Sequence, residues 1–194
     1  MTSTTLLFVR HGETEANRAR RIQGQDDSPL TERGTADSKQ LATTLLKAGL
    51  DPVRMVVYCS PLTRARETLR RIRTHLDLSG DVAYDPRLME IDFGIYTGQP
   101  VDQVLPVIGR HKQETALPYP GGESGDDLKQ RVVSFVDDAK TRHGNGQVLV
   151  VTHFGVIETV IGHYTAPQDI PIRPDHGRVY RIVLMNPGGR LEVF

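Results

Sequence analysis

Short apolar runs recur along the chain, and several of them end abruptly in polar residues. The first run, Leu-Leu-Phe-Val, stops at Arg10 and His11. Four consecutive apolar residues are typical of a strand that is buried on both faces of a parallel sheet. Similar runs occupy residues 55–59 and 147–152, so we expect buried strands there and at residues 6–10.

Segments with helical spacing alternate with these strands. Apolar residues recur every three or four positions after each run, which predicts amphipathic helices. Ser60-Pro61 is expected to supply an N-cap and an N1 proline. The predicted helices cover residues 31–48, the segment after Pro61, the segment that opens at Ser124, and a short piece through residue 161. A last strand over residues 178–185 and a hairpin-like tail follow.

The middle of the chain is less regular. A short strand is expected at residues 82–84, and a short helix near residues 101–108 lies inside a long excursion over residues 96–125. Long excursions in compact domains are often functional lids. The alternation elsewhere predicts an α/β fold, a three-layer sandwich with a mainly parallel central sheet and helices on both faces. We expect one domain over residues 1–194.

Composition narrows the function classes. Lys and Arg number 24 and so do Asp and Glu, so the formal net charge is zero and no global field attracts nucleic acid or a membrane surface. A single cysteine, Cys59, rules out an internal disulfide and suits a reducing compartment. The first residues lack a charged leader and no apolar stretch reaches transmembrane length. We therefore expect a cytoplasmic protein.

The polar residues at the strand ends predict an anion site. Arg10 and His11 follow the first strand, Arg64 opens the helix after the second, and His153 follows a later one. If these strands are neighbours, two arginines and two histidines meet in one pocket. Guanidinium groups match phosphate oxygens, and helix N-termini add N–H donors. A phosphoryl group is the expected occupant.

Phosphoryl transfer needs a nucleophile, charge stabilisation and a proton for the leaving oxygen. His11 can attack if it is neutral and a backbone carbonyl fixes its other ring nitrogen. A protonated His153, with Arg10 and Arg64, would stabilise the equatorial oxygens. Glu90 has apolar neighbours in sequence, which would favour retention of the proton that it donates. The same carboxylate would later deprotonate water.

Taken together, these motifs resemble the histidine phosphatase superfamily, in its phosphoglycerate-mutase-like branch. The resemblance spans residues 5–163, and nothing distinctive matches beyond residue 162. The motifs that carry it are LFVRHGET at residues 7–14 with Asn17, CSPLTRARET at 59–68, Glu90, GGES at 121–124 and VTHFG at 151–155.

The resemblance implies a phosphoglycerate mutase-like fold and a role for each matching residue. His11 would be the phosphorylated nucleophile and Glu90 the proton donor, in a mechanism without metal or cofactor. The implied phosphate and substrate contacts are Arg10, Asn17, Gln23, Gly24, Arg64 and His153. The expected partner is a small phosphorylated molecule, and the oligomeric state is open, with a homodimer as one option.

Two activities of this family remain in competition. The mutases carry a longer insertion after the Glu90 motif, rich in basic and aromatic residues, whereas this chain has only residues 110–112 and Tyr119 there. A shorter lid admits water, so we favour a phosphomonoester hydrolase of the histidine acid phosphatase type. The alternatives are a cofactor-dependent phosphoglycerate mutase and, less favoured, a silent phospho-ligand binding module. The GGES motif resembles broad-specificity and α-ribazole phosphatases without identifying the ester.

Each of these residues has an ordinary interpretation when it is taken alone, and only their joint occurrence favours a site. Other enzyme classes lack support. A cysteine phosphatase needs an arginine six positions after its nucleophile, where Cys59 has Ala65. Neither a His-Glu-x-x-His zinc motif nor a P-loop occurs. Of the remaining histidines, we expect a solvated position for three and leave two undecided: the first group is His75, His111 and His143, and the second is His163 and His176.

Overall fold

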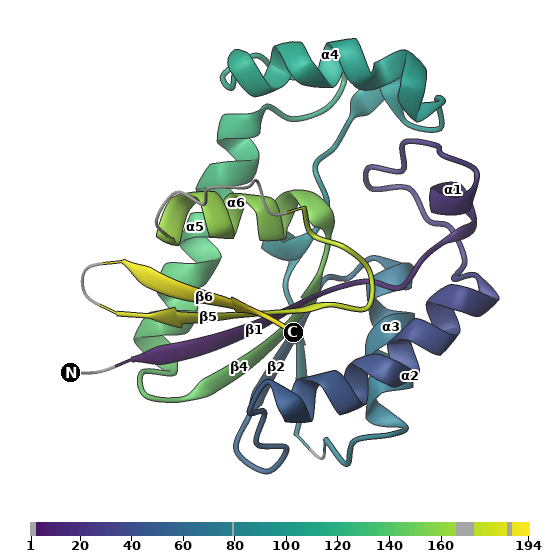
Figure 1. Ribbon diagram of the computed structural model, residues 1–194. Helices are drawn as coiled ribbons and strands as arrows, with labels where there is room; N and C mark the ends of the chain where they lie inside the picture. Colours follow the sequence, from purple (N-terminus) through teal and green to yellow (C-terminus); the bar gives the residue numbers. More distant parts are fainter. Residues whose placement is uncertain (1–2, 79, 166–172, 186–187) are drawn as a thin grey trace.

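The computed structural model describes residues 3–78, 80–165, 173–185 and 188–194, which form one six-stranded sheet with helices on both faces (Figure 1). The strands are β1 (Thr4–Arg10), β2 (Val56–Cys59), β3 (Val82–Tyr84), β4 (Gln147–Thr152), β5 (Val179–Leu184) and β6 (Gly189–Val193). The α-helices are α1 (Glu15–Arg18), α2 (Glu32–Lys47), α3 (Thr63–Arg73), α4 (Val101–Gln113), α5 (Gly125–Arg142) and α6 (Phe154–Tyr164). Two 3-10 turns, η1 (Pro86–Leu88) and η2 (Gly94–Tyr96), precede α4.

The strand order is β3-β2-β4-β1-β5-β6, which makes the sheet mainly parallel at its centre. β4 pairs in parallel with both β1 and β2, and β2 pairs in parallel with β3. β5 runs antiparallel to β1, and β6 returns antiparallel to β5 as the predicted tail. The expected α/β class with a mainly parallel sheet is confirmed.

Helices cover the two faces of the sheet in separate layers (Figure 1). α2 and α3 pack on one face with inward residues such as Leu7 and Val57, and α5 and α6 pack on the other with Leu6 and Phe8. Adjacent β1 residues therefore point to opposite cores, and both are fully buried. This explains the unbroken apolar run that predicted the strand.

The register of the central strands brings the polar strand ends together. Arg10 at the end of β1 pairs with Thr152 at the end of β4, so His11 and His153 follow at the same edge. Cys59 at the end of β2 pairs with Val151. The three strands are neighbours, which meets the condition that the sequence argument left open.

The start of α3 differs from the prediction. Its N-cap is Leu62, whereas Ser60-Pro61 lies before the helix. The Ser60 hydroxyl is engaged elsewhere, because it contacts His153 Nε2 at 2.7 Å and accepts the Leu62 N–H at 3.3 Å. The first N–H of the helix, from Thr63, is instead accepted by the Asp27 carboxylate at 3.0 Å.

The excursion after η2 contains a longer helix than the sequence suggested. α4 extends from Val101 to Gln113 and continues through Pro106, beyond the predicted end near residue 108. It lies apart from the sheet, above α6 in Figure 1. One contact between the two helices is the ion pair of Lys112 with Glu158 on α6, at 2.7 Å.

The start of α2 approaches the loop after β1 through two glycines. A Cβ on Gly12 would lie 2.5 Å from the Gly34 carbonyl oxygen, and a Cβ on Gly34 would collide with the Glu13 backbone. Backbones can approach this closely only where both residues lack a side chain. The helix thereby supports the segment that carries His11.

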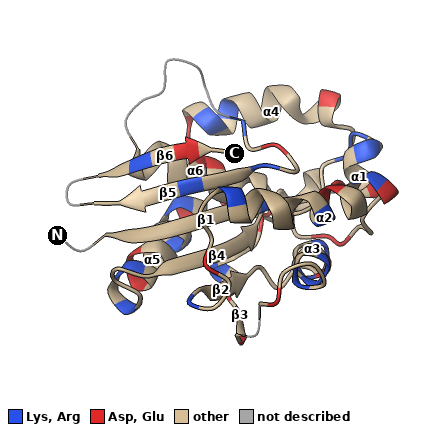
Figure 2. Cartoon of the chain, turned by 60° about the horizontal axis from the view of Figure 1, so that its bottom comes forward, with Lys and Arg blue, Asp and Glu red and all other residues tan. Residues whose placement is uncertain are grey.

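The charges are mixed along the fold. Figure 2 shows Lys and Arg interspersed with Asp and Glu on the helices, as the balanced composition predicts. Within the described ranges, no helix has both the length and the apolar character needed to span a lipid bilayer.

Candidate active site

His11 is held in place by hydrogen bonds from both its backbone and its ring. Its N–H donates to the Thr152 carbonyl at 2.9 Å, and the next N–H, from Gly12, donates to the Thr68 hydroxyl at 2.9 Å. Its ring Nδ1 lies 2.8 Å from the Gly12 carbonyl oxygen. A carbonyl oxygen only accepts, so Nδ1 carries a proton in this contact. In the neutral ring, Nε2 then carries the lone pair that a nucleophile needs.

Burial keeps that ring neutral. Desolvation lowers the pKa of the buried His11 well below its ordinary value, and the neighbouring His153, Arg64 and Arg10 act in the same direction. The condition that the sequence analysis set for attack, a neutral ring fixed by a backbone carbonyl, is therefore met.

His153 lies beside His11, with ring centroids 5.2 Å apart. Its Nε2 contacts the Ser60 hydroxyl at 2.7 Å, and its Nδ1 is buried without a partner among the described residues. The pKa of His153 lies well below its ordinary value, chiefly because the ring is buried and also because Arg64 and Arg10 are close to it. The low pKa favours a neutral His153 ring in the site without a ligand, and its expected protonation beside a transferring phosphoryl group stays a prediction. If the Ser60 hydroxyl donates to Nε2, the neutral ring keeps its proton on Nδ1.

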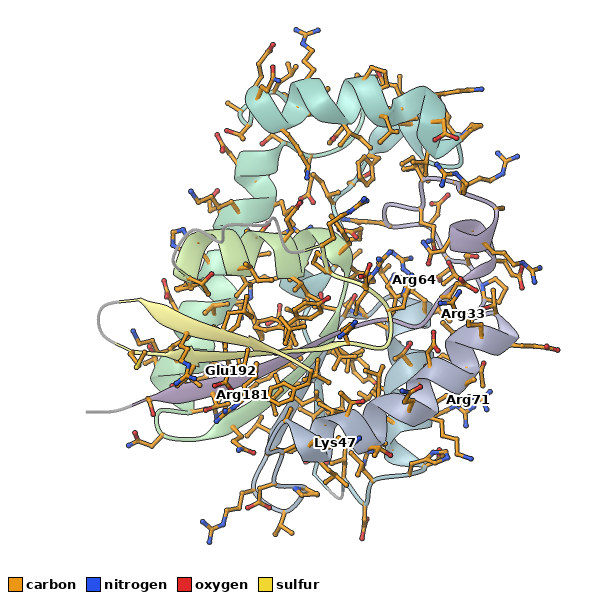
Figure 3. All side chains as sticks on the ribbon, viewed as in Figure 1. Arg33, Lys47, Arg64, Arg71, Arg181 and Glu192 are labelled. Atoms are coloured by element: carbon orange, nitrogen blue, oxygen red, sulfur yellow. The ribbon has the colours of Figure 1, made fainter. Side chains whose placement is uncertain are left out.

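Arg64 and Arg10 are anchored through part of each guanidinium group. Arg64 is 1% exposed, and its two terminal nitrogens donate to the Asp26 and Gly24 carbonyl oxygens at 2.6 Å each. Figure 3 shows it in the interior, between α6 and α1 in this view. Arg10 donates from Nη1 to the Pro174 carbonyl oxygen at 2.9 Å and lies over the Phe154 ring, 5.4 Å from its centroid. These contacts fix both side chains before any ligand binds.

Three unused nitrogens belong to Arg10, Arg64 and His153, residues close enough for the charge of one to shift the pKa of another. Among the residues that the structure describes, only four buried side-chain nitrogens lack a hydrogen-bond partner, and three are Arg10 Nε, Arg64 Nε and His153 Nδ1. A buried donor without a partner costs about 1–3 kcal/mol, and more when it is charged. Burial also lowers the pKa of both arginines, although a guanidinium remains charged in proteins. An anion with several acceptor oxygens would satisfy all three donors.

Glu90 reaches the site from the loop before η2, at the N-terminus of α6. Its carboxylate accepts the Gly155 N–H at 3.1 Å and the Ile91 N–H at 2.9 Å. The sequence neighbours of Glu90 did not indicate these two polar partners, and its role as proton donor stays a prediction. A Cβ on Gly155 would lie 2.5 Å from Glu90 Oε1, so the glycine makes room for it. The sequence analysis expected N–H groups at helix N-termini to bind the phosphate. At α6 the Gly155 N–H donates to the Glu90 carboxylate instead, and at α3 the Thr63 N–H donates to Asp27.

Arg131, which the sequence analysis missed, holds the Glu90 segment together with Glu123. Arg131 on α5 donates to the Met89 carbonyl oxygen at 2.6 Å and to the Glu90 carbonyl oxygen at 3.1 Å. It also forms an ion pair with Glu123 at 2.6 Å, and both side chains are 18% exposed. Glu123 lies in the GGES motif, which was noticed, whereas Arg131 followed no motif and was not singled out.

The softer predicted contacts, Asn17, Gln23 and Gly24, lie at the edge of the site. The Thr14 hydroxyl is 2.9 Å from the side-chain oxygens of both Asn17 and Gln23. The Thr14 N–H also donates to the Asn17 side-chain oxygen at 3.2 Å, which leaves the Asn17 NH₂ group as a donor for other partners. Gly24, at a φ of +54°, places its carbonyl oxygen against Arg64. Its observed contact therefore positions an arginine, and its role toward substrate stays a prediction.

The solvent exposure of the remaining histidines differs in part from what the sequence predicted. His75 is exposed as expected, but His111 is 6% exposed and stacks on Tyr119 with ring centroids 4.0 Å apart. His143 is partly buried against the Tyr58 hydroxyl at 3.0 Å. His163 is exposed, whereas His176 joins the site through the His11 carbonyl oxygen. The free thiol of Cys59 is buried.

Residues 6–193 match the model of the histidine phosphatase superfamily (branch 1). The chain belongs to this family. The match continues to residue 193, so the predicted end of the resemblance near residue 163 was too early. It takes in β5, β6 and His176.

Other proteins are similar to this member of the histidine phosphatase superfamily over most of its length. Phosphoserine phosphatase 1 from Hydrogenobacter thermophilus is 36% identical over 157 residues, which cover 76% of this chain and 70% of the relative. The structure of a phosphoglycerate mutase from Bacillus anthracis matches with a TM-score of 0.82 at 25% identity. The match covers 99% of this chain and 92% of the mutase chain. The structure of an alpha-ribazole phosphatase from Shigella flexneri matches with a TM-score of 0.78 at 27% identity. This match covers 98% of this chain and 95% of the phosphatase chain. The phosphoglycerate mutase-like fold is thereby confirmed.

The unpartnered donors of this histidine phosphatase superfamily member predict tight binding of inorganic phosphate. Ligand that binds only the folded state adds about 2.7 kcal/mol of stability at 100 times its Kd. We expect phosphate to raise the melting temperature, measured against sodium chloride of equal ionic strength. Arg10→Gln should lose most of this increase, and Arg110→Gln, an exposed arginine of α4, should keep it. An unchanged phosphate effect in Arg10→Gln would contradict the site.

Proposed function

We propose that this protein is a metal-independent phosphomonoester hydrolase that works through a phosphohistidine on His11. The observation that carries the proposal is the set of three unpartnered buried nitrogens, the guanidinium donors Arg10 Nε and Arg64 Nε together with His153 Nδ1, beside a neutral imidazole whose Nδ1 is fixed. The donors suit the oxygens of a phosphoryl group, and Nε2 supplies a lone pair to attack it. The family and the two relatives named as phosphatases support the same class of reaction.

In the first half of the reaction, His11 Nε2 attacks phosphorus and the bond from phosphorus to the ester oxygen breaks. Arg10, Arg64 and His153 donate to the phosphoryl oxygens, where charge accumulates in the transition state. Glu90 gives its proton to the departing oxygen, so the alcohol leaves neutral. The Gly12 carbonyl continues to accept from Nδ1 of the phosphorylated ring.

In the second half, water attacks the phosphorus of the phosphohistidine. Glu90, now a carboxylate, takes a proton from the water, and the bond between phosphorus and Nε2 breaks. Inorganic phosphate leaves and His11 returns to its neutral form. One carboxylate thus acts first as acid and then as base, which requires that it reach the same oxygen position in both steps.

A phosphoglycerate mutase is the second candidate, because a protein of that name is similar to this chain over nearly all of its length. A mutase would return the phosphoryl group from His11 to a bound acid instead of to water. The region after Glu90 favours hydrolysis, because the His111 ring is stacked on Tyr119 and the two cationic side chains beside it, Arg110 and Lys112, are paired with Glu114 and Glu158. The physiological ester is not assigned.

The proposal is tested with p-nitrophenyl phosphate in the presence of EDTA. We expect steady release of phosphate, and a fall of at least roughly 10³-fold in kcat for His11→Ala, because the nucleophile is lost. His75→Ala, at an exposed histidine, is the matched control and should keep full activity. Loss of activity on chelation would indicate a metal enzyme. Faster interconversion of 3- and 2-phosphoglycerate, primed by the bisphosphate, would indicate the mutase.

The role of Glu90 predicts a dependence on the leaving group. A nitrophenolate leaves without a proton, whereas an alkoxide does not. In Glu90→Gln, kcat/KM for an alkyl phosphate should fall by about 10²-fold or more, and kcat/KM for p-nitrophenyl phosphate should fall far less. Glu158→Gln, an exposed carboxylate of α6, controls for charge removal. Equal losses with both esters would show that Glu90 does not protonate the leaving group.

A further inference from the structure

His176 lies against the nucleophile although it is 165 residues away in the sequence. β5 runs antiparallel to β1, and the last pair in their register joins Val9 to Val179. The residues that enter β5 therefore lie beside those that leave β1. This topology places the turn at His176 and Gly177 next to Arg10 and His11.

Two contacts join this turn to the site. His176 Nδ1 is 2.6 Å from the backbone carbonyl oxygen of His11. A carbonyl oxygen only accepts, so Nδ1 carries the proton and donates it. The two imidazoles also meet edge to face, with centroids 5.4 Å apart and planes at 63°. Next to them, the Pro174 carbonyl accepts from Arg10 Nη1, so the same short segment contacts two consecutive site residues.

The segment itself is fixed to the core. The buried Tyr180 hydroxyl accepts the Asp175 N–H at 2.7 Å and lies 3.2 Å from the Arg173 carbonyl oxygen. Burial lowers the pKa of His176 to about 4, so the ring is neutral at neutral pH and adds no like charge beside a phosphorylated His11. A neutral donor on a fixed segment suits a supporting role.

We propose that His176 is a positioning residue for the nucleophile, acting through its hydrogen bond to the His11 carbonyl and its edge contact with the His11 ring. The backbone of His11 is then fixed from both sides, by Thr152 at its N–H and by His176 at its carbonyl. The ring is restricted on one side by His176 and on another by His153. This inference rests on the proposed function of His11.

Three variants of His176 separate the hydrogen bond from simple packing. Small misplacements of a reacting group can cost about 10²-fold in rate. We expect His176→Ala to slow phosphohistidine formation by roughly 10- to 100-fold, measured by rapid quench, with little change in KM. His176→Asn should recover most of the rate, because its amide nitrogen can take the place of Nδ1. His176→Gln, whose amide corresponds to the position of Nε2, should not.

The controls distinguish positioning from loss of structure. His163→Asn changes an exposed histidine of α6 and should behave as the wild type. Melting temperatures are measured for all four variants. If His176→Ala does not fold, the comparison of His176→Asn with His176→Gln still decides. Equal rates in those two variants, or a wild-type rate in His176→Ala, would overturn the role of His176.

Failure of the proposed function gives a different result. If the wild type forms no phosphohistidine from p-nitrophenyl phosphate, the function fails and the rate comparison has no meaning. The nitrogen NMR shifts of the His11 ring then test His176 independently. They should move in His176→Ala and remain near wild type in His176→Asn, and unchanged shifts in both would overturn the positioning role.

Discussion

Two arginines and two histidines crowd together at one edge of the sheet, and much of the surrounding structure serves to hold them there. Arg10, Arg64, His11 and His153 share a buried space, and burial lowers the pKa of all four. Each is held by a neutral oxygen from a carbonyl or a hydroxyl, which fixes the side chain without cancelling its charge. An arrangement of this kind is costly when empty and favourable around a phosphoryl group.

Much of the surrounding fold supplies those oxygens. The Gly24 carbonyl serves Arg64 from the loop after α1, and the Pro174 carbonyl serves Arg10 from the turn before β5. Glycines at residues 12 and 34 let α2 approach the His11 loop, and Gly155 leaves space for the Glu90 carboxylate. Arg131 then ties the Glu90 segment to α5. Segments far apart in sequence are thus needed to position a few atoms.

The sequence predicted the parts of this arrangement that follow from strand pattern. Apolar runs that end in Arg10-His11 and in His153 located the strands, and alternation with helices predicted their shared edge. The start of α3 was misplaced because Ser60 has the chemistry of an N-cap but is used by His153, a contact that depends on β2 lying beside β4. Arg131 and His176 were not identified, since both contact the site segments through backbone carbonyls, which leave no mark in a sequence.

The protonation state of the histidines was also beyond the sequence. Burial, and after it the neighbouring Arg64 and Arg10, lowers the pKa of His153, and the extent of this burial could not be read from the sequence. Transfer of the phosphoryl group through His11 is tested by the configuration at phosphorus before and after hydrolysis. A phosphorothioate ester made chiral with oxygen isotopes is hydrolysed in isotopically labelled water. Two successive displacements predict retention of configuration at phosphorus, and inversion would show that water attacks the ester directly.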